Sequence, residues 1–99
     1  MAKSRLPTSF PPGQFIREEL EARGWTQTDL ARVIGRPVQL VNEIIRAKKR
    51  ITAITAKELG AAFGTGPELW LNLENTWQLA QAPNPDPRIP KRAAALRAA

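Results

Sequence analysis

The chain contains, at residues 27–46, the stretch QTDLARVIGRPVQLVNEIIR, and this stretch decides the fold. Its apolar and small side chains recur at the spacing of two short helices, with Gly35 between them. Ala31 leaves room for a second helix to cross the first at close range. Gly35 tolerates the positive φ that a tight turn requires. We therefore predict a helix-turn-helix.

The second helix of this pair has one apolar face and one polar face. Val41 and Ile44 lie three residues apart and face the core, whereas Gln39, Asn42 and Arg46 lie on the other side. A helix that is held on one face and polar on the other has the shape that enters a DNA major groove. The pattern predicts DNA binding.

Positive charge is concentrated around the same elements. The chain of 99 residues carries a formal charge of +6, and the segment from Arg32 to Arg50 alone carries +5. A run of charge by itself usually marks only a solvated face. Here it coincides with the turn, the second helix and the following loop, where phosphate contacts are needed.

The composition excludes several other classes of function. No apolar run is long enough to span a bilayer and no signal peptide is evident, so we expect a cytoplasmic protein with no membrane partner. Cysteine and histidine are absent, which removes disulfides, the usual metal ligands and the commonest general base. We expect no cofactor, no metal site and no catalytic residue, and hence no enzyme.

Capping signals and helical periodicity predict an all-α fold of five helices. Gly24 is suited to end the first helix, and Thr26 with Asp29 can cap the second. Thr52 or Thr55 can cap the fourth. The expected helices run over residues 13–23, 27–34, 37–47, about 52–63 and 67–82.

The five predicted helices form one compact domain, residues 13–82, and the two ends of the chain differ from it in composition. Residues 1–12 hold three prolines and are expected to form a flexible arm. Residues 83–99 form a proline-rich, basic and flexible tail, in which four prolines oppose regular structure. Its last nine residues are expected to become helical only in a complex and to fray alone.

Gln39 and Asn42 are the strongest candidates for base contacts. Their amides can bond bidentately to adenine, although on an isolated helix they would be ordinary exposed polar residues. Val38 and Leu40 are too apolar for open solvent, and each either packs internally or touches a thymine methyl. Glu43 can accept a hydrogen bond from cytosine, or form a salt bridge with a neighbouring arginine, Arg46 or Arg36.

Phosphate contacts are expected from the start of the first helix of the pair and from the basic residues. Gln27 lies where side chain and free backbone N–H groups meet a phosphate. The other candidates are Arg36, Arg46, Lys48, Lys49 and Arg50.

The tryptophans favour packing over base stacking, because Trp70 lies on a helical apolar stripe and Trp25 is expected in the core. Trp77, near the end of the last predicted helix, is assigned to a subunit or partner interface. This stripe exceeds what so small a core needs, so we assign the dimer interface to Trp70, Leu73 and Trp77.

The chain resembles the Cro/C1-type (XRE, lambda repressor-like) helix-turn-helix family, and within it the HigA-type antitoxins. The resemblance covers residues 15–82, and the string FGTGPELWLNLENTWQL at residues 63–79 separates this group from generic phage-type repressors. By position, the family's recognition residues fall on Pro37, Val38, Gln39, Asn42 and Glu43, with Gln27 on phosphate. Many relatives have other residues at Arg36 and Pro37, and the basic tail lies outside the family pattern.

The resemblance implies an antitoxin that binds and neutralises a RelE-like mRNA endonuclease toxin. It also implies a dimer that represses its own operon on a palindromic operator. Two alternatives remain open: a stand-alone repressor without a toxin, and a protein-interaction module whose helix-turn-helix no longer binds DNA.

Overall fold

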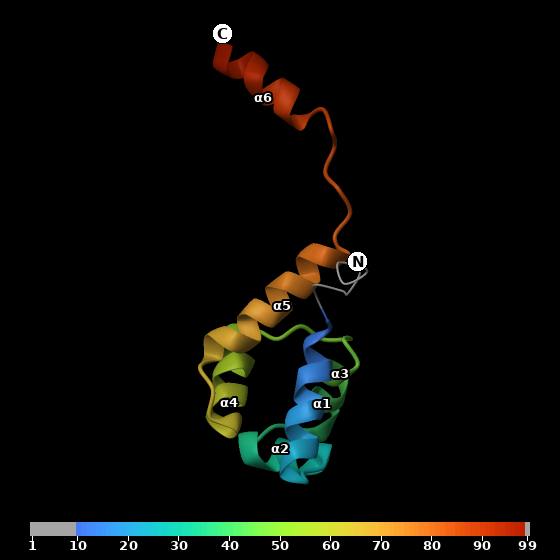
Figure 1. Ribbon diagram of the computed structural model, residues 1–99, viewed down its shortest axis with the longest axis vertical. Helices are drawn as coiled ribbons and strands as arrows, with labels where there is room; N and C mark the ends of the chain where they lie inside the picture. Colours follow the sequence, from blue (N-terminus) through green and yellow to red (C-terminus); the bar gives the residue numbers. More distant parts are fainter. Residues whose placement is uncertain (1–9, 99) are drawn as a thin grey trace, which may run out of the picture.

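The computed structural model describes residues 10–98, and all regular secondary structure in this range is helical. Five helices form a compact body, and a sixth stands apart from it (Figure 1). Within residues 10–98, no helix is long and apolar enough to cross a bilayer. The helices are α1 (Pro12–Arg23), α2 (Gln27–Ile34), α3 (Val38–Ile45), α4 (Ala53–Phe63), α5 (Pro67–Gln81) and α6 (Ile89–Ala98).

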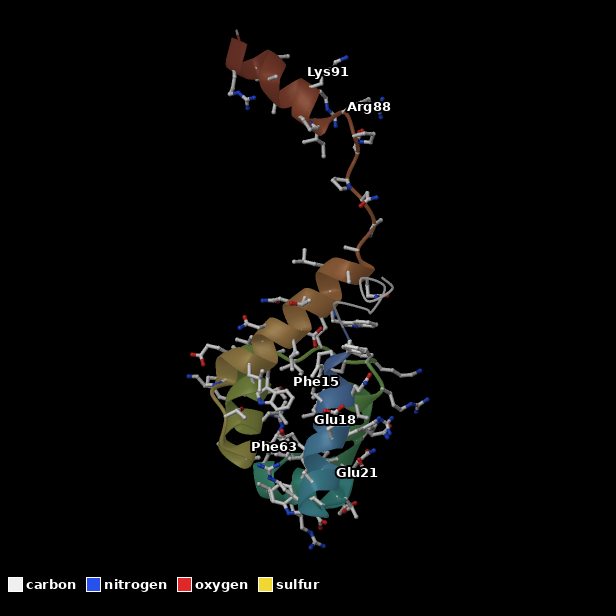
Figure 2. All side chains as sticks on the ribbon, viewed as in Figure 1. Phe15, Glu18, Glu21, Phe63, Arg88 and Lys91 are labelled. Atoms are coloured by element: carbon white, nitrogen blue, oxygen red, sulfur yellow. The ribbon has the colours of Figure 1, made fainter. Side chains whose placement is uncertain are left out.

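The core lies between α1, α3, α4 and α5, and α2 closes one end of it (Figure 1). Figure 2 shows Phe15 of α1 and Phe63 of α4 in the space between these two helices. Trp70 of α5 is only 1% exposed and packs beside Phe63, with 5.6 Å between the ring centroids. Its indole N–H donates to the Thr65 hydroxyl at 2.9 Å, so this aromatic residue is buried with its polar group satisfied.

The predicted capping signals are confirmed for α1, α2 and α4. Thr26 accepts from the backbone N–H of Asp29 at 3.0 Å, and the Asp29 carboxylate accepts from the backbone N–H of Thr26 at 2.8 Å. Gly24 and Gly35 end α1 and α2 with φ of 67° and 70°, a conformation that favours glycine. Of the two threonines proposed for α4, Thr52 is the cap.

Helix α3 is shorter than predicted. Pro37 precedes the first helical residue and takes an extended conformation at the N-cap, with φ −62° and ψ 144°. At the other end the helix stops at Ile45, because Ala47 has a φ of 60° and leaves the right-handed helical region.

The left-handed Ala47 gives a testable prediction. For a residue with a Cβ this conformation costs roughly 1–2 kcal/mol, whereas glycine adopts it freely. Glycine also loses more backbone entropy on folding, so we expect Ala47→Gly to raise the free energy of unfolding by about 0.5–1 kcal/mol. Urea unfolding followed by circular dichroism measures this. The matched control, Ala61→Gly on the exposed side of α4, should instead lower stability by about as much; a loss of stability at both positions would contradict the argument.

The prediction of five helices and a flexible tail is corrected by α6. Pro90 is the second residue of α6, where a missing N–H costs nothing, so it does not prevent the helix. Alanine-rich sequence then favours helix along residues 93–95. Asp86 accepts from the backbone N–H of Arg88 at 2.9 Å and from the Arg92 guanidinium at 3.1 Å, which stabilises the first turn. The Arg88 side chain also donates to this carboxylate, at 3.1 Å, and this bond above all lowers the pKa of Asp86 from its ordinary value.

The first and last helices of the body have bounds close to those predicted. Helix α1 begins at Pro12, one residue before the predicted start, and α5 ends at Gln81. The predicted arm falls mainly on residues 1–9, which lie outside the described residues.

Candidate DNA-recognition face

The position of α3 is determined by its buried side. Val41, Ile44 and Ile45 are at most 4% exposed and pack into the core, as the sequence pattern predicts for Val41 and Ile44. Ala31 of α2 is 5% exposed, consistent with its predicted place at the helix crossing. The opposite side of α3 is thereby presented outward as a rigid ridge.

The four residues assigned to base contacts all lie on α3, and they differ in exposure. Gln39 is exposed, whereas Asn42 and Glu43 are half-buried. The alternatives left open for the two apolar residues are now separated: Leu40 packs against the core, and Val38 is 44% exposed. Of this pair, only Val38 is available to a thymine methyl.

A hydrogen bond joins the two helices of the motif. The Asn42 amide nitrogen donates to the Gln27 side-chain oxygen at 3.2 Å. With its oxygen occupied, the Gln27 amide keeps its two N–H donors, which suit a phosphate oxygen. The bond therefore orients the phosphate candidate on α2 and the base candidate on α3 together.

Within α3, Gln39 and Glu43 form a second pair. The Gln39 amide nitrogen donates to the Glu43 carboxylate at 3.3 Å, one helical turn away. The Gln39 oxygen and the second Glu43 oxygen stay free to accept from an exocyclic amine of adenine or cytosine. Glu43 thus takes Gln39 as its partner, where the sequence favoured Arg46 or Arg36.

The loop after α3 carries the main basic cluster. The backbone N–H groups of Lys48 and Lys49 both donate to the Glu43 carbonyl, at 2.8 and 3.2 Å, so the loop folds back on the end of α3. Their side chains and that of Arg50 are exposed. A surface hollow beside α3 gathers most of the phosphate candidates; its lining is Arg36, Leu40, Lys48, Lys49, Arg50, Thr52 and Thr55. Arg46, also exposed, is not part of that lining.

Among the charged phosphate candidates, Arg36 is the one that forms an ion pair within the described residues. Its guanidinium lies 3.0 Å from both carboxylate oxygens of Glu58 on α4, and both side chains are partly shielded. An ion pair of this exposure contributes little to stability, but it removes part of the positive charge that Arg36 would offer to DNA.

A buried carboxylate that the sequence analysis missed holds the end of the basic loop. Glu74 of α5 is 5% exposed; it accepts from the backbone N–H of Ile51 at 2.9 Å and from the Gln78 amide. Ile51 itself is 3% exposed. The signal was present, because Glu74 lies on the same helical stripe as Trp70 and Trp77, and a buried acid there requires a donor from another segment.

The predicted dimer residues of α5 do not share one environment. Trp70 is corrected, because it is enclosed in the core of its own chain and has no surface for a second copy. Leu73 and Trp77 are half-buried. Trp77 lines a pocket together with Ile44 and the basic loop, so part of this side chain faces its own chain.

Known proteins share this helix-turn-helix arrangement. The family model described as "Helix-turn-helix" matches residues 16–70 of the chain. The regulator YddM of Escherichia coli K12, described as an uncharacterized HTH-type transcriptional regulator, is 31% identical over 71 residues, covering 72% of this chain and 76% of YddM.

Two solved structures are similar to more than two thirds of this chain. One is an addiction module antidote protein of the HigA family from Coxiella burnetii, with a TM-score of 0.68, 35% identity, and coverage of 71% of this chain and 77% of that one. The other is the antitoxin HigA of Pseudomonas aeruginosa, solved with the higBA promoter. Its TM-score is 0.69 at 33% identity, with 72% and 78% of the two chains covered.

Proposed function

The chain belongs to the Cro/C1-type helix-turn-helix family of DNA-binding antitoxins and transcription regulators, and from this we propose that it is the antitoxin and autorepressor of a toxin–antitoxin operon. In this proposal it binds palindromic operator DNA as a homodimer. It also binds directly to a RelE-like mRNA endonuclease encoded beside it and neutralises that toxin.

The observation that carries the DNA half is the outward face of α3. Two amide side chains and an exposed valine project from a helix whose other side is locked into the core, and the basic loop folds back beside them. Base candidates and phosphate candidates therefore face the same side of the molecule, as major-groove readout requires. The promoter complex of the similar Pseudomonas antitoxin supports this assignment.

The dimer follows from the symmetry of a palindromic site. Two copies must place their α3 helices roughly 34 Å apart, one turn of DNA. We assign the contact between copies to α5, where Leu73 and Trp77 are half-buried and Leu69 is 44% exposed. Truncating these side chains should shift the molecular mass in solution from dimer to monomer without unfolding the chain.

The toxin half is supported by the likeness to HigA-family antitoxins. It is tested by co-expressing the tagged chain with the product of its neighbouring gene and purifying through the tag. We expect a stoichiometric complex, and a gel shift of the shared upstream DNA that weakens with added salt. Absence of a complex would refute the toxin half, and absence of a shift would refute the DNA half.

A stand-alone repressor is the second candidate, and the description of the curated relative as a transcriptional regulator favours it. The same experiment separates the two functions. Specific DNA binding without any co-purified neighbour would leave a repressor alone.

A further inference from the structure

Helix α6 and the linker before it are unlike the rest of the chain. Both lie beyond residue 70, where the family match ends. Residues 82–88 connect α5 to α6 without forming a helix and turn at residues 87–88, and α6 stands away from the five-helix body (Figure 1). Figure 2 shows Arg88 and Lys91 at the near end of α6, remote from the core. The segment therefore contributes little to the packing of the five-helix body.

The chemistry of this segment is that of a polyanion-binding element. Residues 83–99 carry a net charge of +3, with Asp86 as the one acid. Asp86 pairs with Arg88 and Arg92 and orders the first turn, but the side chains of both arginines remain 77% and 63% exposed. Lys91 and Arg97 are exposed as well. The positive charge is thus presented on an ordered helix.

The apolar side of α6 is weak by comparison. Ile89 and Leu96 are its two large apolar side chains, 48% and 81% exposed, and only Arg92 and Ala93 lie between them at helical spacing. A helix that docks in a protein groove presents a row of larger anchors at this spacing. The charges, together with the basic face around α3, therefore favour DNA over a protein partner.

We propose that α6 is a second DNA-contacting element, which binds backbone phosphates flanking the site read by α3; this inference rests on the DNA-binding function proposed above. The linker contains Pro83, Pro85 and Pro87, and proline-rich chain extends by about 3.1 Å per residue. The five residues before the turn therefore span roughly 15 Å, which separates α6 from the body and lets it reach DNA beside the site read by α3. Such contacts read no sequence, but they add affinity that falls with salt.

The test replaces three cations of α6 in the full chain: Lys91→Gln, Arg92→Gln and Arg97→Gln. Binding is measured by fluorescence anisotropy over a series of salt concentrations, on a duplex trimmed to the palindrome and on one with ten added base pairs on each side. We expect the variant to bind the long duplex about 10-fold more weakly at low salt. The slope of log K against log salt should become shallower by about 0.9 for each phosphate that the variant no longer neutralises. Both proteins should bind the trimmed duplex equally.

Ile89→Gln with Leu96→Gln is the matched control, because it keeps every charge of α6. DNA binding should not change. Equal affinity and equal salt dependence of the charge variant and the parent on the long duplex would overturn the proposal. A second result would also overturn the proposal: the charge variant binds DNA normally, and the Ile89/Leu96 variant binds the co-expressed toxin more weakly. In that case α6 would be a protein-binding helix.

The two proposals fail in different ways. In one outcome, the parent binds its upstream DNA and random duplex equally well, and the charge variant binds both with lower affinity and weaker salt dependence. Operator recognition then fails, and the role of α6 stands. If the parent prefers its upstream DNA and the charge variant does the same with unchanged affinity, only the role of α6 fails. A parent that binds no DNA overturns both.

Discussion

Replacing Gln39 and Asn42 together by alanine is expected to abolish specific binding to the operator while the chain stays folded. Each bidentate amide–base contact is worth about 1–3 kcal/mol of discrimination, so removing two should weaken operator binding by about 10²-fold or more. Asn42 also gives up its hydrogen bond to Gln27, which leaves the Gln27 amide without its orienting partner. Binding to random DNA should change little, because the basic side chains remain.

The measurement is a titration of labelled operator and of random duplex of equal length, beside thermal unfolding of the variant. The matched control is Asn75→Ala with Gln81→Ala, which removes the same two side-chain types from exposed positions of α5. Toxin binding should survive in both variants. Unchanged operator affinity in the Gln39/Asn42 variant would refute the contact assignment.

The phosphate candidates should respond in a different way. Lys48→Ala with Lys49→Ala is expected to weaken binding to every duplex by a similar factor and to reduce its salt dependence, because these side chains do not report on sequence. The contrast between the two variants separates base reading from charge attraction, which a single affinity on one duplex would not do.

The helix-turn-helix could be predicted from the sequence because its signals are local. The capping box of Thr26 and Asp29 and the left-handed Gly24 and Gly35 act within three or four residues, and all three predictions are confirmed. The apolar spacing of Val41 and Ile44 likewise determined which side of α3 is buried. The local sequence pattern alone therefore predicted which side of α3 faces outward.

Contacts between distant segments were not predictable in this way. The Arg36–Glu58 ion pair and the Glu74–Ile51 hydrogen bond join residues 22 and 23 positions apart, so they depend on how α4 and α5 pack. Packing of Trp70 was predicted and its burial confirms this, but the dimer assignment of Trp70 failed because it depends on the same long-range packing. Periodicity placed Trp70 on an apolar stripe, but whether that stripe faces the core or a second copy is decided by the other helices.

Gly13→Ala is expected to be the most destabilising glycine-to-alanine substitution in the body, although helix propensity alone predicts that it stabilises the chain. In a helix interior, alanine is favoured over glycine by roughly 0.5–1 kcal/mol. Here, a Cβ on Gly13 would lie 2.0 Å from the carbonyl oxygen of Ile45 and 2.6 Å from its Cα. These are backbone atoms, so the first turn of α1 must move away from the last turn of α3.

Overpacking of this kind typically costs 1–3 kcal/mol and occasionally more, so the clash outweighs the gain in propensity. We expect the free energy of unfolding to fall by about 2 kcal/mol or more, measured by urea denaturation. Operator affinity should fall with it, because α3 carries the candidate base-contact side chains and Ile45 is its last residue.

Gly24→Ala is the comparison that isolates the steric cause. A Cβ there meets no heavy atom within 4 Å, but its φ of 67° strains any residue other than glycine. That strain costs roughly 1–2 kcal/mol and acts on the loop before α2, not on the seating of α3. For each kcal/mol of stability that it loses, Gly13→Ala should therefore weaken operator binding more than Gly24→Ala does. If Gly13→Ala were neutral or stabilising, α1 and α3 could not be in the close backbone contact that positions the recognition helix.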